Sequence, residues 1–394
     1  MKILEVVPYF YPAWAYGGPG KIVHDPSRYF AEQGHDVTVY TSDAYDDKQR
    51  MPKEKYILNV SRFLVRYFRN IHNKLTYRYN IFITPGMFTR SLFEFHKFDV
   101  VHMHDFYTLE NVWLGWLARL YNKPYIISVH GCLEEKRLEA RSLFKSAFLY
   151  LFGQDLLKHA SALIATSEQE IDNYRRFNIP KSKIKLIGHG VRSIEFTTQA
   201  LKKACRKHFK LSEKDTVVTF LGRIHKIKGL DMLIEAISQI TDPNLHFVIA
   251  GPDDGFLLEL KELIKEKNLG KRVTLWHGCF GEERAQLFKA SDIFVYPSYS
   301  EGFSLGILEA ASVGLPLVIT TKCYFDQVRK YNAGVIVEPN PESIAKGILQ
   351  LARDPKKRNQ AADNSKRLIK ENYSIEIVGE QLLSIYRKSM SEKA

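Results

Sequence analysis

Two glutamates, Glu301 and Glu309, have the spacing and surroundings of a ligand-binding pair. Glu301 opens the segment Glu301-Gly302-Phe303-Ser304, which follows an apolar stretch and precedes a helical pattern. Ser304 is a typical helix N-cap residue, so we expect the backbone N–H groups of residues 302–304 to face a ligand. A carboxylate in an apolar helix is costly without a partner, and Glu309 lies among such neighbours. The pattern therefore favours binding over two surface glutamates.

Residues 222–229 carry several cations in the order Gly222-Arg223-Ile224-His225-Lys226-Ile227-Lys228-Gly229. They lie between an expected strand and an expected helix. Cations at the end of a strand, opposite a helix N-terminus, suit a diphosphate. Solvated surface cations are the alternative. We favour binding, because Arg223 follows directly on a buried strand and should not reach solvent easily.

Two further segments follow expected strands. His130-Gly131 comes directly after the apolar run 125–129, and His104-Asp105 has the same kind of position after residues 100–103. A lone histidine is more often structural, but the strand end favours contact with a substrate. The segment Gly17-Gly18-Pro19-Gly20 has glycines that let backbone amides approach an anion. It does not match G-x-G-x-x-G, and an ordinary turn explains it equally well.

The elements that position these residues form two βαβ series in tandem. Short apolar runs alternating with helical patterns indicate parallel sheets. The first series has expected strands at 3–8, 36–41, 98–104, 125–129 and 162–166, and the second has them at 216–221, 245–250, 273–277, 293–297 and 317–320. A long helix is expected over 137–159, and helices dominate from 341 to about 390. Ligands of such sheets bind outside the carboxyl ends of the strands, so the interdomain cleft is the expected site.

The composition is that of a soluble protein: of 394 residues, 45% are hydrophobic and 26% are charged. No apolar run approaches the roughly 18–20 residues of a membrane-spanning helix, and the N-terminus shows no h-region, so no signal peptide is expected. The four cysteines are scattered, which favours reduced thiols in a cytoplasmic protein over a zinc site or disulfide framework.

The formal net charge of +13 points to anionic partners. Residues 56–98 contain seven Lys and Arg residues but one acid, Glu94, together with many aromatic residues. Such a segment could attach the protein to the inner face of a membrane. The alternative, given equal weight, is that aromatic residues such as Phe63, Phe68 and Phe82 belong to the core. No nucleic-acid-binding module is recognisable, so nucleic acid is not an expected partner.

With these motifs the sequence resembles the retaining glycosyltransferases of family 4 (glycosyl transferases group 1). The resemblance covers nearly the whole chain. It rests mainly on E-x7-E at Glu301 and Glu309, G-R-x4-K-G at 222–229, and His130-Gly131. Supporting segments are Gly17-Gly18, Gly34-His35-Asp36-Val37, Val101-His102-Met103-His104, Ala165-Thr166-Ser167 and Gly251-Pro252.

The resemblance implies an α/β protein of GT-B architecture, with two facing Rossmann-like domains and an interdomain cleft. It places an acceptor-side domain at 1–192, completed by the C-terminal helix 373–394, and a donor domain at 193–372. The activity implied is transfer of a sugar from a nucleotide-sugar donor, UDP- or GDP-linked, to an acceptor hydroxyl with retention. We expect a glycan or lipid-linked acceptor, as in cell-surface polysaccharide or glycolipid assembly.

The family's roles carry over where residues match. The implied catalytic residues are His130, Glu301, Arg223 and Lys228. Arg223 and Lys228 would bind the diphosphate, Glu309 the ribose, and Glu301 and His130 the sugar. The implied donor-binding set is completed by Gly17, Gly18, Gly222, Gly278, Cys279, Phe280, Gly302, Phe303 and Ser304. Neither a metal ion nor a further cofactor is required, because Arg223 and Lys228 supply the positive charge.

Three departures from the family pattern stand out: Pro26 within the first helical pattern, His189-Gly190 at the interdomain turn, and Cys323-Tyr324-Phe325-Asp326 near the nucleotide end. Proline there should kink the helix or delay its start. The enzymatic alternatives are a sugar-nucleotide epimerase and a phosphorylase. The sequence lacks the glycine fingerprint of a nicotinamide-dependent oxidoreductase. Charge alone suggests the other alternative, a non-catalytic nucleotide- or nucleic-acid-binding protein.

Overall fold

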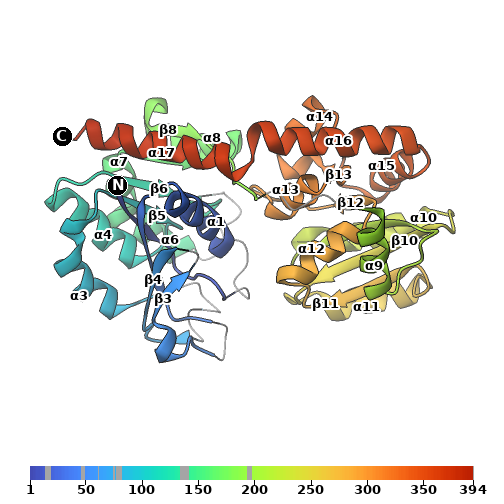
Figure 1. Cartoon of the computed structure of the whole chain (residues 1–394), viewed down its shortest axis with the longest axis horizontal. Coiled ribbons are helices and arrows are strands. Elements are labelled where there is room, and N and C mark those ends of the chain that lie inside the picture. Colours follow the sequence, from blue (N-terminus) through green and yellow to red (C-terminus); the bar gives the residue numbers. More distant parts are fainter. Residues whose placement is uncertain are drawn as a thin grey trace. The chain divides into compact units, whose positions relative to one another are not determined.

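The computed structural model describes residues 1–13, 19–45, 49–60, 62–73, 76, 82–133, 142–192 and 198–393. Gly17 and Gly18 lie outside the described residues. The chain forms two compact units (Figure 1). Unit 1 combines Met1–Gly190 with Ile375–Ala394, and unit 2 is Val191–Ser374.

Unit 1 contains an eight-stranded sheet in the order β3-β4-β2-β1-β5-β6-β7-β8. Its strands are β1 (Lys2–Val6), β2 (Asp36–Ser42), β3 (Ile57–Val60), β4 (Phe63–Phe68), β5 (Val100–His104), β6 (Tyr125–Ser128), β7 (Ala162–Ala165) and β8 (Ile184–Leu186). All neighbouring strands are parallel except the pair β3 and β4. The parallel strands confirm the first βαβ series predicted from the sequence.

Helices cover both faces of this sheet, and residues that alternate along β1 separate two apolar clusters. Ile3 packs with residues of α1 and α17. Leu4 packs with residues of α3, α4 and α7. The helices are α1 (Pro19–Glu32), α3 (Pro85–Glu94), α4 (Leu109–Leu120), α6 (Ser142–Phe148), α7 (Gln154–His159), α8 (Glu168–Arg175) and α17 (Ile375–Ser391). Because α17 supplies buried Tyr386 to the first cluster, the end of the chain contributes to the core of unit 1.

Two helix expectations need correction. Helix α1 begins at Pro19 and continues past Pro26, so the proline does not delay its start. In the predicted helix over 137–159, a π-helical turn (Leu149–Gly153) separates α6 from α7, and residues 137–141 lie outside the described part. Gly153 packs so closely on Phe106 that a Cβ there would lie 3.0 Å from the ring.

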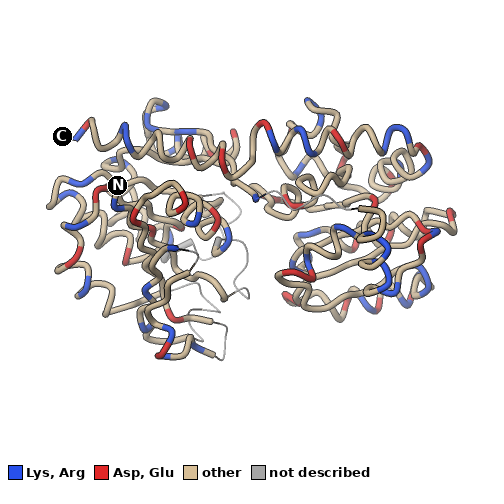
Figure 2. The backbone as a smooth tube through the Cα atoms, viewed as in Figure 1, with Lys and Arg blue, Asp and Glu red and all other residues tan. Residues whose placement is uncertain are grey.

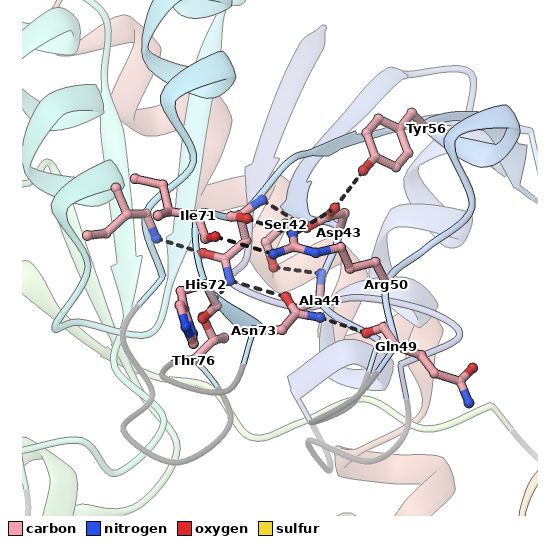
Figure 3. A network of polar contacts seen from close by, with 12 residues as sticks. Ser42, Asp43, Ala44, Gln49, Arg50, Tyr56, Ile71, His72, Asn73 and Thr76 are labelled. Atoms are coloured by element: carbon pink, nitrogen blue, oxygen red, sulfur yellow. Dashed lines mark hydrogen bonds and ion pairs between the residues drawn. The ribbon is translucent and has the colours of Figure 1, made fainter.

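A polar network centred on Asp43 ties together the segments that follow β2 and β4 (Figure 3). The carboxylate of Asp43, fully buried, accepts hydrogen bonds from Arg50, from the hydroxyl of Tyr56 and from the backbone N–H of Asn70. Arg50 also donates to the carbonyl oxygens of Asn70 and Ile71. Three donors thus satisfy the hydrogen-bonding groups of this buried carboxylate. The network therefore fixes the base of the loops at this edge of the sheet.

Unit 2 contains a six-stranded, all-parallel sheet in the order β11-β10-β9-β12-β13-β14. Its strands are β9 (Thr216–Leu221), β10 (Leu245–Gly251), β11 (Val273–His277), β12 (Ile293–Tyr296), β13 (Leu317–Thr320) and β14 (Gly334–Val337). Its helices are α9 (Gln199–His208), α10 (Leu230–Gln239), α11 (Leu257–Glu266), α12 (Gly281–Ala290), α13 (Leu305–Ser312), α14 (Gln327–Lys330), α15 (Pro341–Ala352) and α16 (Pro355–Asn372). The strand order reverses between β9 and β12, the position where ligands bind in such sheets.

Candidate active site

Lys228 is positioned by a short turn directly after β9. It ends the 3-10 helix η6 (Lys226–Lys228), and Gly229 follows with φ +67°. A Cβ on Gly229 would lie 2.1 Å from the carbonyl oxygen of Pro297, so only glycine fits there. The backbone thereby carries the Lys228 side chain into the protein rather than into solvent. The prediction that this loop presents a cation at the end of a strand is realised at Lys228.

The ammonium of Lys228 is buried and forms an ion pair with Glu301. Its Nζ also lies 5.3 Å from the centroid of the Tyr296 ring. Burial alone would lower the pKa of Lys228, but Tyr296 and Glu301 outweigh it and the pKa is raised. Lys228 is therefore a permanent cation, held at the carboxyl ends of β9 and β12.

Glu309 is the buried partner of a second cation. It lies in α13 with 3% of its surface exposed. The guanidinium of Arg284, from α12, donates to Glu309 Oε2 through Nε at 2.6 Å and through a second nitrogen. This arrangement meets the expectation that a carboxylate in this helix requires a partner. Arg284 was missed in the sequence, because the stretch Gly281-Glu282-Glu283-Arg284 reads as an exposed helix start.

One detail of the predicted site holds in part, and another is wrong. Ser304 occupies the N-cap position of α13 as predicted, but its side chain makes no capping hydrogen bond. Arg223 does reach solvent: 44% of its side chain is exposed, and it forms an ion pair with Asp254. The turn that buries Lys228 begins three residues later, at Lys226, so the position of Arg223 after a buried strand did not keep it inside.

The remaining predicted residues of unit 2 lie in loops that follow its strands. Gly278-Cys279-Phe280 forms the loop between β11 and α12, with Cys279 buried and Phe280 exposed. Burial raises the pKa of the Cys279 thiol to about 12, so it is not a reactive thiolate. Gly222 and Gly302 are half-buried. The ring of Phe303 packs against Phe325 and Tyr373, which leaves its backbone N–H as the group suited to a ligand.

In unit 1, His130 lies in a sharp turn after β6. His130 has φ +48° and Gly131 has φ +77°, two left-handed residues in succession. The carboxylate of buried Glu170 fixes this turn by accepting from the backbone N–H groups of Gly131 and Thr166, each at 2.7 Å. A strained conformation for a residue with a side chain persists only when its surroundings impose it. The turn thus aims the His130 ring rather than leaving it to rotate with a loop.

The His130 ring ends a chain of buried hydrogen bonds that we call the histidine cluster: Glu5, His102, His104, His130 and Tyr386. His130 Nε2 lies 2.9 Å from His104 Nδ1, and His104 Nε2 lies 2.7 Å from Glu5 Oε2. The Tyr386 hydroxyl donates to Glu5 Oε1 at 3.1 Å. His102 lies between Tyr386 (2.6 Å) and the hydroxyl of Ser128 (2.8 Å).

The histidine cluster lines a cavity of about 30 Å³, which His189 and Gly190 also border. Burial lowers the pKa values of His102, His104 and His189 to about 3. These rings are therefore neutral at physiological pH. Burial also raises the pKa of Glu5, although His102 and the Tyr386 hydroxyl act in the opposite direction.

Glu5, His102 and His104 are also the one described group with the donor atoms of a metal site, all within 4.8 Å of one another. However, protein hydrogen bonds already occupy both Glu5 oxygens and both nitrogens of each ring. Glu5 was missed in the sequence. The available signal was an acid within the continuous apolar strand Ile3-Leu4-Glu5-Val6-Val7.

A second cavity, of about 10 Å³, is bordered by residues at the ends of β1 and β2 and by Glu110. Glu110 Oε1 accepts from the backbone N–H and the hydroxyl of Thr84, both at 2.8 Å. Its buried Oε2 has no partner within the part of the chain that the structure describes. The cavity has room for one water-sized polar group.

Several aromatic residues of the basic segment 56–98 belong to the folded core, whereas Lys74 and Arg78 of this segment lie outside the described residues. Phe63, Phe82 and Phe95 are buried, whereas Phe68 is half-buried. Glu94 forms ion pairs with Arg66 and Arg90, which reduces the free positive charge. Lys and Arg residues are spread over both units rather than gathered in this segment (Figure 2). Phe93, on α3, is 73% exposed. No described helix is long and apolar enough to cross a membrane.

Sequence families match both halves of the chain. "Glycosyltransferase Family 4" matches residues 16–193, and "Glycosyl transferases group 1" matches residues 202–368. The chain belongs to glycosyltransferase family 4. This glycosyltransferase is 25% identical to an uncharacterized glycosyltransferase of Methanocaldococcus jannaschii over 99% of each chain. It is 30% identical to a D-inositol 3-phosphate glycosyltransferase of Mycobacteroides abscessus over 56% of this chain and 52% of that relative.

Solved structures confirm the fold of the glycosyltransferase. Anabaena HepE in complex with UDP-glucose matches with a TM-score of 0.78 at 19% identity, over 98% of this chain and 100% of that one. Sucrose-phosphate synthase of Thermosynechococcus elongatus matches with a TM-score of 0.77 at 21% identity, over 99% of both chains. The GT-B fold predicted from the sequence is therefore confirmed.

Proposed function

We propose that this glycosyltransferase moves a sugar from a nucleotide-sugar donor, UDP- or GDP-linked, to an acceptor hydroxyl with retention of anomeric configuration. The observation that carries the proposal is the buried Lys228–Glu301 pair. Glu301 precedes α13, and Glu309 within α13 pairs with Arg284. Both glutamates belong to E-x7-E. The similar Anabaena structure, which contains UDP-glucose, supports a nucleotide-sugar donor.

Lys228 stabilises the leaving group. When the bond between the sugar and the diphosphate breaks, negative charge develops on the diphosphate oxygens. A buried, permanent cation stabilises this charge more strongly than an exposed one, because water does not screen it. Arg223 adds a second, more exposed cation. On this proposal side chains supply the positive charge, and no metal ion is needed.

Glu301 binds the sugar rather than attacking it. Its carboxylate is paired with Lys228, which lowers its availability as a nucleophile. Displacement through a covalent glycosyl-enzyme intermediate requires a free carboxylate beside the reacting carbon. The pairing therefore favours a front-face reaction, in which the leaving phosphate takes the proton of the acceptor hydroxyl. Glu309, oriented by Arg284, accepts hydrogen bonds from the ribose hydroxyls.

The acceptor is proposed to be a glycan or a lipid-linked glycan in polysaccharide or glycolipid assembly at the cytoplasmic face of the membrane. Support comes from the exposed apolar side chains of α3 and α4. They are Leu92, Phe93, Trp116 and Leu120. Arg90 and Arg119 lie on the same helices, where they form ion pairs with Glu94 and Asp155. This surface replaces the broader segment 56–98 as the proposed contact with an anionic bilayer. Salt-sensitive co-sedimentation with anionic vesicles that Phe93→Ser weakens would support it, and no binding at low salt would reject it.

The donor experiment is a thermal-shift screen of the purified chain against UDP-, GDP- and ADP-sugars, followed by product analysis. We expect one nucleotide class to raise the melting temperature, and Glu309→Gln to reduce that shift. Glu342→Gln, an exposed glutamate on α15, is the matched control. Proton NMR of the anomeric signal of the first product then reports retention or inversion. No stabilisation by any nucleotide sugar would contradict the proposal.

A further inference from the structure

The hydrogen bonds of the histidine cluster have a direction that begins at Glu5. Glu5 Oε1 accepts from the Tyr386 hydroxyl, and Glu5 Oε2 lies 2.7 Å from His104 Nε2. We take Glu5 as the ionised carboxylate, because His102 and the Tyr386 hydroxyl lower its pKa against the effect of burial. An ionised carboxylate can only accept, so His104 Nε2 donates to it. A neutral imidazole has one N–H. Because His104 uses its proton toward Glu5, its Nδ1 is a bare acceptor.

The bare Nδ1 of His104 determines where His130 carries its proton. The partner of His104 Nδ1 is His130 Nε2, at 2.9 Å, and a bare acceptor requires a donor opposite it. The two rings are nearly parallel, with an interplanar angle of 3°. His130 must therefore carry its proton on Nε2, which leaves Nδ1 bare.

His130 Nδ1 is the open end of this chain. It is buried and has no hydrogen-bond partner among the residues that the structure describes. The ring borders the cavity of about 30 Å³, which has room for polar groups of a ligand. A bare ring nitrogen at this position can accept a hydrogen bond from a donor that enters the cavity.

We propose that Glu5 and His104 are positioning residues that fix His130 as its Nε2–H tautomer, so that Nδ1 accepts a hydrogen bond from a sugar hydroxyl. The inference rests on the proposed function for the identity of the ligand. It selects a ligand group that donates, such as a hydroxyl, over one that only accepts, such as a carboxylate or phosphate oxygen.

The donors and acceptors among Tyr386, His102 and Ser128 follow in the same way. Because the Tyr386 hydroxyl donates to Glu5, its oxygen accepts from His102 Nδ1. His102 Nε2 is then bare and accepts from the hydroxyl of Ser128. Ser128 therefore belongs to a side branch that does not reach His130, which makes it a matched control.

The test is ¹⁵N NMR of the full chain labelled at histidine. The sample contains EDTA and no substrate. Long-range ¹H–¹⁵N correlations distinguish protonated from bare ring nitrogens. His130→Gln assigns the signals of this ring. We expect one neutral His130 tautomer with the proton on Nε2. A proton on Nδ1, or a mixture of tautomers, would overturn the proposal.

Two variants test the cause. In Glu5→Leu, His104 loses the acceptor at Nε2. Both arrangements of the two ring protons then leave one N–H without an acceptor, so a single His130 tautomer is no longer imposed. The His130 proton should therefore appear on both Nε2 and Nδ1. Ser128→Ala should leave the His130 tautomer unchanged. An unchanged tautomer in Glu5→Leu would contradict the role of Glu5. If that variant does not fold, the measurement on the wild-type chain still decides the tautomer.

The same spectra separate this proposal from the alternatives. Zn²⁺ that shifts the ring nitrogens of His102 and His104 would identify them as metal ligands and overturn the proposal. Because the measurement needs no donor or acceptor, its failure is distinct from failure of the proposed glycosyl transfer.

Discussion

Unit 1 and unit 2 both place polar side chains near the carboxyl ends of parallel strands. The two units differ in the kind of side chain that lies there. In unit 2 these side chains are full charges held in ion pairs, Lys228 with Glu301 and Arg284 with Glu309. In unit 1 they are neutral rings in a directed chain of hydrogen bonds that starts at Glu5. Fixed charge suits a diphosphate, whereas a neutral, directional group suits sugar hydroxyls. The difference means that unit 2 suits an anionic group, whereas unit 1 suits a hydroxyl group.

The largest expected effect comes from removing the buried cation of unit 2. Lys228→Met should lower kcat/KM about a hundredfold, since a hydrogen bond to a charged group contributes about 1.5–3 kcal/mol. It should also lower the melting temperature, because Glu301 loses its cation. Lys226→Met, in the same turn but exposed, is the matched control. Equal kinetics in both variants would refute the role of Lys228.

The neutral rings of unit 1 predict a pH effect on stability. Burial lowers the pKa of His102, His104 and His189 to about 3, against about 6.5 in an unfolded chain. Between these values the unfolded chain binds more protons, so the free energy of unfolding falls as the pH falls from 6.5 toward 3. The expected loss is on the order of 2 kcal/mol per pH unit. The raised pKa of Glu5 opposes this effect with a single group.

Hydrogen exchange with mass spectrometry at pH 7.0 and 5.5, corrected for intrinsic rates, measures this difference in each unit. Peptides from 1–190 should lose more protection than peptides from 191–374. Equal loss in both units would show that the histidine cluster does not dominate the pH response.

The two glutamates of unit 2 should differ in kinetics. Glu309→Gln should raise the donor KM about tenfold with little change in kcat, because it weakens ribose binding in the ground state and transition state alike. Glu301→Gln should instead lower kcat, because its contact with the sugar matters most in the transition state. Initial-rate kinetics with varied donor distinguish the two. The same pattern in both variants would argue for a purely structural pair.

The smallest effect is expected at the exposed cation. Arg223→Ala should raise the donor KM only a few-fold, and less at high salt, because exposed charges are screened. Asp254→Asn, which frees the Arg223 guanidinium, should lower the donor KM slightly. An effect of Arg223→Ala as large as that of Lys228→Met would remove the distinction between buried and exposed cations.

The sequence was sufficient to predict the parallel strands and the places of Lys228, Glu301, Glu309 and His130 in the fold, because each signal is local. The roles of these four residues stay predictions. Every one follows an apolar strand or lies in an apolar helix, and the family motifs identify them. Tyr386 and Glu5 could not be paired in this way, because 381 positions separate them and only the docking of α17 brings them together.

Other features gave misleading local signals. The antiparallel pair of β3 and β4 was missed because the basic residues of this segment suggested a surface contact. The alternation of buried and half-buried residues along β4 was the available signal for a strand. Arg223 was placed inside because its exposure depends on the turn geometry of η6, which side-chain type does not reveal. Arg284 follows two acids, and its partner Glu309 is 25 residues away.

The bonds around Asp43 are directed largely at the backbone. Arg50 donates to the carbonyl oxygens of Asn70 and Ile71, Asn73 donates to that of Gln49, and Asn70 accepts from the N–H of Ile83. Backbone groups are the same whatever side chain a position carries. Residues between these ties can therefore be exchanged during evolution without loss of the frame, provided that Asp43, Arg50 and Asn70 remain. This edge of unit 1 can consequently change in sequence while the sheet and the histidine cluster stay unchanged.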